Sequence, residues 1–139
     1  DLYDHPQTRY VADFVGTSNF FDGRIAALSD GRASLLLEDG MRLEGRTGPG
    51  LDAGRAGCLS IRPEQIRLAR EAEPASLEVT VQNRIFLGEH TEYLVRHPAL
   101  GGIIVLAPRQ TEHGVRSFAV GDHAYVSWSR DSALVLERD

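Results

Sequence analysis

Short apolar runs, each alternating with polar residues and ending at a turn signal, make up most of the chain after residue 17. Strand side chains alternate between two faces, so this period of two predicts β-strands rather than helices. The dipeptides Asp30-Gly31 and Asp39-Gly40 lie between such runs and predict tight hairpins. The predicted strands are 20–28, 33–37, 41–44, 58–61, a short strand that ends at residue 68, 76–87, 92–96, 102–106, 125–128 and 133–136.

The longest predicted strand, 76–87, is expected to bend near Asn83. In the strand that follows it, alternation places Thr91, Tyr93 and Val95 on one face and Leu94 on the other. This pattern is typical of a sheet with one face in a core and one face outside.

A unit of strand, polar break and second strand occurs twice. In the first copy Leu59 and Ile61 share a strand face and Pro63 interrupts the run, because proline has no amide hydrogen for a ladder. In the second copy the polar residues 129–132 separate two apolar runs. Gly54 corresponds to Gly121, Ser60 to Ser127, Ile61 to Trp128 and Glu64 to Asp131.

Five short strands in each half predict an all-β fold of two small OB-like, MOP-like barrels that share a core. We expect residues 17–75 to form the first barrel and 76–139 the second. Trp128 is the largest expected core residue, and Trp128→Ala should cost roughly 3–5 kcal/mol if it is buried. The expected shared core consists of Leu59, Ile61, Val79, Val81, Phe86, Val126, Trp128 and Leu136.

Residues 1–16 carry a helix signature rather than a strand signature. Pro6 suits the first helical position, Tyr10 and Phe14 lie on one apolar stripe, and Gly16 suits the stop. The chain begins without Met and without a signal-peptide layout, and we expect it to be a piece of a longer protein.

Composition narrows the function. The net charge of -5 argues against a nucleic-acid reader, which normally carries a basic face. All 15 basic residues are arginine, so the chain lacks the lysine of a phosphate-binding P-loop and of Schiff-base chemistry. The single cysteine, Cys58, rules out an internal disulfide, fits a reducing compartment and is expected to be a buried strand residue. No apolar run approaches the ~18 residues of a membrane span.

The candidate functional residues do not assemble into a catalytic set. The five histidines lie at scattered turns and strand ends without metal-ligand spacing, so we predict no metal site. Opposite charges lie at both breaks, Arg62 with Glu64 and Arg130 with Asp131. Such a pair either tunes a catalytic acid or stabilises a turn or interface, and the structural role is favoured.

Two groups of residues are candidates for contact with a partner. Asn19 and Phe20 either pack in the core or face a partner. Self-association is expected at the first break, around Arg62, Pro63 and Glu64, so that Arg62→Glu should weaken a dimer. The corresponding residues of the second break, Arg130 and Asp131, complete the predicted interface or regulatory set.

Several stretches resemble a known family. Residues 2–19 resemble the junction after the nucleotide-binding domain in ATP-binding subunits of ABC importers of the polyamine, ferric-iron and sugar type. The run Ile61-Arg62-Pro63-Glu64 looks like the signature of their C-terminal transport-associated OB (TOBE) region. The run 86–88 followed by Tyr93, and the closing unit 121–128, also fit that region.

The resemblance implies a regulatory and dimerising domain of a subunit that helps to import a small solute. It implies a homodimer through the same domain, contacts with the chain's own nucleotide-binding domain, and membrane permease subunits as partners. It also implies a cytoplasmic place at the inner face of the membrane. ATP and Mg²⁺ would belong to the parent protein, and the piece at hand is expected to hold no cofactor and no catalytic activity.

Two other functions stay open. A duplicated molybdate- or oxyanion-binding barrel would share the OB-like fold, but Thr17-Ser18-Asn19 lacks the arginine expected in the Ser-Ala-Arg-Asn motif of those proteins. A nucleic-acid-binding OB module would need a basic groove with stacking aromatics, and the acidic balance disfavours it.

Overall fold

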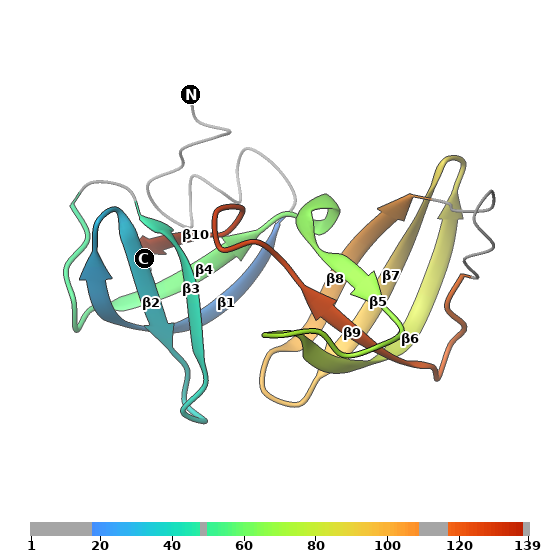
Figure 1. The fold of residues 1–139 in the computed structure, drawn as a ribbon, viewed down its shortest axis with the longest axis horizontal. Coiled ribbons are helices and arrows are strands. Elements are labelled where there is room, and N and C mark those ends of the chain that lie inside the picture. Colours follow the sequence, from blue (N-terminus) through green and yellow to red (C-terminus); the bar gives the residue numbers. More distant parts are fainter. Residues whose placement is uncertain (1–17, 48–49, 109–116, 138–139) are drawn as a thin grey trace. The chain divides into compact units, whose positions relative to one another are not determined.

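The structure is a computed structural model that describes residues 18–47, 50–108 and 117–137. It is all-β, and each of the ten predicted strands is present (Figure 1). No helix within those ranges is long and apolar enough to cross a membrane. The predicted helix of residues 1–16 lies outside the described residues.

The chain folds into two compact units. Unit 1 comprises the residues up to Arg62 and those from Ser129 on, and unit 2 comprises Pro63–Trp128. The expected division into 17–75 and 76–139 differs from this one. Residues 63–75 belong to unit 2, because the strand after the first break pairs within unit 2 although the strand before that break lies in unit 1. The last strand pairs within unit 1 although the strand before the second break lies in unit 2.

Unit 1 is a closed five-stranded barrel in the order β1-β2-β3-β10-β4. The Asp30-Gly31 turn joins the first two strands as predicted, and both of its residues have positive φ. The last strand closes the barrel by pairing parallel to β3 and antiparallel to β4. The strands are β1 (Asn19–Ser29), β2 (Arg32–Leu36), β3 (Arg42–Thr47), β4 (Ala56–Ile61) and β10 (Leu134–Glu137).

Unit 2 is a five-stranded sheet in the order β5-β9-β6-β7-β8. The predicted bend near Asn83 is a bulge, where the register of β6 on β7 shifts between Val81 and Asn83. Its elements are the 3₁₀-helix η1 (Pro63–Gln65), β5 (Arg67–Ala69), β6 (Leu77–Leu87), β7 (His90–His97), β8 (Gly101–Pro108) and β9 (His123–Ser127).

The weak repeat in the sequence reappears in the register of the strands. Ser60 in β4 faces Leu134 in β10, and its counterpart Ser127 in β9 faces Arg67 in β5. The next pairs inward are Leu59 with Val135 and Val126 with Leu68. The two copies of the strand–break–strand repeat therefore exchange their second strands: β10 pairs with β4 of the first copy, and β5 pairs with β9 of the second copy. The two pairs have equivalent registers.

Six of the eight expected core residues are buried, three in each unit. Leu59, Ile61 and Leu136 lie inside unit 1, and Val79, Val81 and Val126 lie inside unit 2. Each unit therefore has buried apolar residues of its own.

The other two residues were wrongly expected in the core. Phe86 is 51% exposed because it lies near the tip of the β6–β7 hairpin, where the guanidinium of Arg84 packs 5.1 Å from the centre of its ring. Trp128 is only half-buried. The cost of Trp128→Ala should accordingly fall below the 3–5 kcal/mol of a fully buried ring.

Candidate functional site

The candidate site lies in the two breaks, which are the points where the chain passes from one unit to the other. We call residues 62–65 the first crossing segment and residues 129–132 the second crossing segment. The first leaves unit 1 at Arg62, and the second enters it at Ser129. Each is described within the unit to which its residues belong.

A proline builds the first crossing segment. Pro63 is buried and begins η1, whose turn closes when the amide of Ile66 donates to the carbonyl of Pro63 at 3.4 Å. Proline at the start of a helical turn loses no hydrogen bond, and its fixed φ ends the preceding strand. The predicted candidates here differ in exposure: Arg62 is half-buried, whereas Glu64 is exposed, and both make polar contacts.

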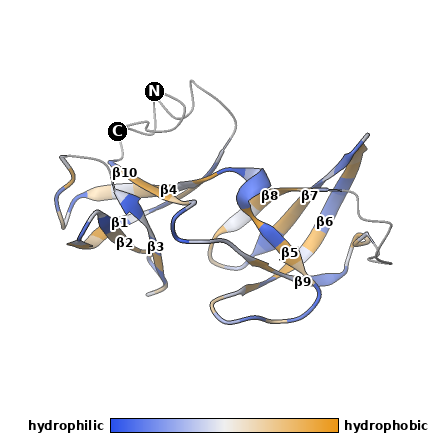
Figure 2. Cartoon of the chain, turned by 45° about the horizontal axis from the view of Figure 1, so that its top comes forward, coloured by the Kyte–Doolittle hydropathy of each residue, from blue (hydrophilic) through white to orange (hydrophobic). Residues whose placement is uncertain are grey.

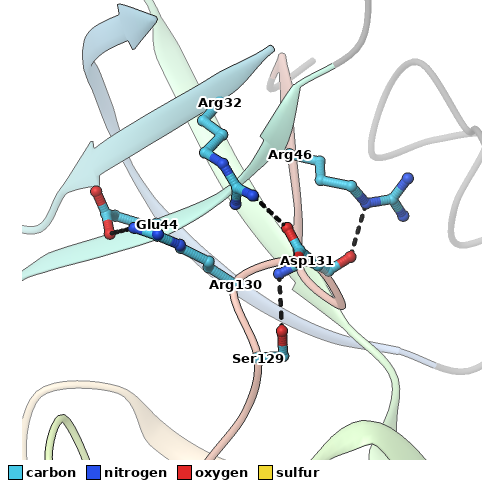
Figure 3. Close-up of polar contacts among 6 residues, drawn as sticks. All are labelled: Arg32, Glu44, Arg46, Ser129, Arg130 and Asp131. Carbon is cyan, nitrogen blue, oxygen red and sulfur yellow. Dashed lines mark hydrogen bonds and ion pairs between the residues drawn. The ribbon is translucent and has the colours of Figure 1, made fainter. Parts of the chain in front are cut away.

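The second crossing segment is a tight turn. The amide of Ser132 donates to the carbonyl of Ser129 at 2.8 Å, and the amide of Asp131 donates to the hydroxyl of Ser129 at 3.2 Å. A serine side chain that accepts from the amide two residues on is a common way to fix a turn. The turn presents Arg130 and Asp131 to the β2–β3 hairpin of unit 1 (Figure 3).

Asp131 binds two arginines at once. Its carboxylate lies 2.6 Å from an amino nitrogen of Arg32, and its backbone carbonyl accepts from Nε of Arg46 at 2.7 Å (Figure 3). Arg32 and Arg46 are direct cross-strand partners on β2 and β3, where two like charges would repel one another. Asp131 therefore offsets a repulsion within the hairpin and ties the crossing segment to it.

Arg130 makes a weaker contact. One of its amino nitrogens lies 3.5 Å from Oε1 of Glu44 on β3, and both side chains are largely exposed. An exposed ion pair of this kind stabilises a fold by at most about 1 kcal/mol. Arg130 and Asp131 thus each attach the segment to a residue of β3 or β2.

A glycine lets Ala133, the residue after the second crossing segment, come close to β3. A Cβ added to Gly45 would lie 2.9 Å from the carbonyl oxygen of Ala133, a distance that side chains do not tolerate. That same carbonyl accepts a hydrogen bond from the amide of Arg46 at 2.9 Å, and Ala133 is fully buried. The missing side chain at residue 45 is thus part of how the barrel closes.

One donor of the cluster is unused. Nη1 of Arg32 is buried and has no hydrogen-bond partner in the described part of the chain. Sequence analysis missed Arg32, Glu44 and Arg46 as members of the site. Arg32 and Arg46 lay just outside the predicted strands 33–37 and 41–44, and nothing local to the three residues pointed to a segment far along the chain.

The structure places the other two predicted contact residues inside unit 1. Asn19 is buried, and its side-chain amide donates to the carbonyl of Ile61 at 3.3 Å. Phe20 packs on a small cluster of buried residues that includes Cys58 and Leu136. Of the two interpretations left open for these residues, core packing is the one that the structure supports.

The contacts described for the second crossing segment attach it to neighbouring strands of unit 1. The serines of the second crossing segment belong to unit 1. The described residues of unit 1 include no histidine, because His90, His97 and His123 all belong to unit 2. Nor do the described residues hold a cluster of His, Cys, Asp and Glu that suits a metal ion. His5 and His113 lie outside the described residues.

Known proteins resemble this chain in sequence and in fold. It is 34% identical over 136 residues to the spermidine/putrescine import ATP-binding protein PotA 1 of Pseudomonas aeruginosa, an alignment that covers 98% of this chain and 36% of that protein. The PotA proteins of Rubrobacter xylanophilus and Nitrosomonas europaea are 31% and 33% identical, with 97% of this chain covered in each case and 36% and 38% of theirs. The chain thus spans little more than a third of the length of these relatives.

A solved structure shares the fold. The cytoplasmic molybdate-binding protein ModG, with molybdate bound, superposes with a TM-score of 0.69 over 86% of this chain and 95% of that one. At 17% identity the likeness concerns the fold alone. The model of the TOBE domain matches residues 59–136, more than half of the chain and a span that contains both crossing segments. The chain therefore belongs to the TOBE domain family.

Proposed function

We propose that this chain is the C-terminal regulatory module of the ATP-binding subunit of an ABC importer for polyamines. The observation that carries the proposal is that relatives named as spermidine/putrescine import ATP-binding proteins align with almost the whole chain. Within the polyamine, iron and sugar classes expected from the sequence, these names favour polyamines. The proposed place of the protein is cytoplasmic, at the inner face of the membrane.

The chain's own residues do not fit Mg-ATP. It contains no lysine, so it cannot complete a Gly-rich phosphate loop, and its described residues form no acidic metal site. We therefore assign ATP binding and hydrolysis to the rest of the parent protein. The module's part is to connect: to the nucleotide-binding domain of its own chain, to a second copy, and through the parent to the permease subunits.

We assign the regulatory contacts to the exposed residues of the crossing segments, Glu64, Arg130 and Asp131, with Arg62 beside them. The strand exchange makes each of these segments a point where the chain passes from one unit to the other, so a partner bound to either segment acts on a link in the chain. Asn19 and Phe20 are left out of this proposal because they pack within unit 1.

The proposal is tested by uptake of radiolabelled spermidine and putrescine in cells that lack their own polyamine importer. The full-length parent with its permease should restore uptake, and uptake of ferric iron and maltose should not change. A parent protein that restores iron or sugar uptake instead would contradict the solute class. The variant Glu64→Arg should alter the ATPase rate of the full-length complex without altering its nucleotide affinity.

The oxyanion-binding alternative has weaker support, since the likeness to ModG extends to fold and not to sequence. Calorimetry with molybdate decides it directly. Tight, saturable binding of molybdate to this chain, measured as the heat of binding, would favour an oxyanion receptor over a transport module.

A further inference from the structure

The outer face of three strands in unit 2 forms a regular grid of side chains. Thr91, Tyr93 and Val95 of β7 are buried, so the residues between them point away from the core. Leu94 leans over its neighbour, with Cδ1 3.4 Å from the place where Gly102 would carry a Cβ. The cross-strand pairs place three rows on this face: Ile85-Glu92-Leu106, Asn83-Leu94-Ile104 and Thr80-Arg96-Gly102.

Large apolar side chains are exposed on and beside this grid. Ile85 and Leu87 are 49% and 47% exposed, and Leu94 is 37% exposed. In Figure 2 orange hydrophobic residues alternate with blue hydrophilic residues along β6 and β7, as in a sheet with two different faces. The outer face of an antiparallel sheet is normally polar, and contiguous exposed apolar residues mark an interaction surface.

The charges on this face are arranged to match a second copy of itself. On β7 the central Leu94 has Glu92 on one side and Arg96 on the other. A two-fold axis that runs across the strands through Leu94 lays two copies of β7 antiparallel, face to face. Glu92 of each copy then meets Arg96 of the other, and in the described part of the chain neither residue takes part in an ion pair.

The same operation places a large residue of the first row over a glycine of the third. Because it exchanges the first row with the third, Leu106 of one copy lies over Gly102 of the other. The central row meets itself, with Leu94 against Leu94. Large against small at facing positions is the arrangement that lets two sheet faces interdigitate.

In the same two-fold arrangement, the end of the grid at Ile85 in one copy lies over a groove of the other copy. A hollow of about 350 Å³ lies beside the third row, and the two-fold axis brings Ile85 and Leu87 of the second copy to it. Leu87 is one row beyond Ile85 on β6, as Glu78 is one row beyond Thr80. The groove is lined by Glu78, Val79, Thr80, Gln82, Arg96, Pro98 and His123.

We propose that this chain pairs with a second copy of itself through the outer face of β6, β7 and β8, with Leu94 at the two-fold axis and Glu92 paired with Arg96 of the other copy. The inference deepens the proposed function, on which it rests, by naming the surface of self-association. It differs from the first crossing segment, where the sequence predicted self-association.

Charge reversal tests the surface. Sedimentation equilibrium on the whole chain should show a concentration-dependent dimer, and Glu92→Arg or Arg96→Glu alone should each weaken it about tenfold or more. The double reversal, Glu92→Arg with Arg96→Glu, should restore most of the affinity because each pair is re-formed with exchanged signs. Glu71→Arg, an exposed reversal away from the grid, and Arg62→Glu should leave the dimer unchanged.

A cross-link provides a second measurement that does not depend on affinity. Leu94→Cys at the axis should form a disulfide with its copy on mild oxidation, because the two side chains meet there. Leu28→Cys is the matched control, since Leu28 is 38% exposed but lies on β1 in unit 1, and it should stay reduced. The native Cys58 is fully buried and should not contribute.

The outcomes separate this inference from the proposed function. A dimer that resists both single reversals, or that Arg62→Glu alone dissociates, overturns the surface and leaves the transport assignment intact. A chain that stays monomeric at every concentration, with no cross-link at residue 94, overturns self-association through this face. Failure of polyamine uptake by the parent protein would instead overturn the transport assignment, whatever the dimer does.

Discussion

At the scale of single residues, Asp131 does more than its exposed position suggests. Replacing it with alanine removes the carboxylate that pairs with Arg32 and offsets the repulsion between the like charges of Arg32 and Arg46. We expect Asp131→Ala to lower the free energy of unfolding in urea by about 0.5–1 kcal/mol. Asp52→Ala is the matched control. Asp52 is also an exposed carboxylate of unit 1, but it lies 4.0 Å from the nearest amino nitrogen of Arg55 and offsets no cross-strand repulsion. Equal effects of the two substitutions would show that Asp131 is an ordinary surface charge.

Gly45 is the other residue whose role is local and testable. Its backbone lies so close to Ala133 that a Cβ would meet the carbonyl oxygen at 2.9 Å. Gly45→Ala should therefore force β3 and Ala133 apart and destabilise the chain by about 1–3 kcal/mol. Gly102→Ala, whose nearest neighbour would be 3.4 Å away, should change stability by less than about 0.5 kcal/mol in the same titration.

At the scale of elements, β10 is the strand on which unit 1 depends. It closes the barrel between β3 and β4, and Leu136 is buried there against Cys58. Leu136→Ala should cost about 2–5 kcal/mol, whereas Leu28→Ala, which removes a partly exposed side chain, should cost far less. Hydrogen exchange followed by mass spectrometry should show faster exchange in β3 and β4 than in β6 and β7. Uniform loss of protection in all four strands would contradict a barrel that loosens on its own.

The elements also show what a sequence can and cannot predict here. Alternation and Asp-Gly turns identified every strand, because both signals are local. The partners of β5 and β10 were not predictable, because alternation tells which face a residue takes and not which strand lies beside it. The same limit applied to the site. The polar break containing Arg130 and Asp131 was visible in the sequence, but the hairpin residues that contact it could be identified only from the parallel pairing of β10 with β3.

At the scale of the whole molecule, the strand exchange means that neither half of the sequence contains a complete unit. A cut between residues 75 and 76 would leave β4 without β10 and β9 without β5. A cut at the unit boundaries instead keeps all five strands of unit 2 in the single stretch Pro63–Trp128. The exchanged strands thus make unit 1 discontinuous in sequence and unit 2 continuous.

This difference predicts how the chain can be divided. The fragment 63–128 should fold alone, with dispersed amide signals in a ¹H–¹⁵N correlation spectrum, because every strand of its sheet keeps its partner. The fragments 17–75 and 76–139 should each give poorly dispersed amide signals, because each lacks a strand that pairs with the edge of its sheet. An unpaired edge exposes a row of backbone donors and acceptors. Mixing these two fragments should recover dispersion, because each then supplies the other's missing strand. Dispersed spectra from 17–75 or 76–139 alone would show that the exchange is dispensable and that each half holds a fold without it.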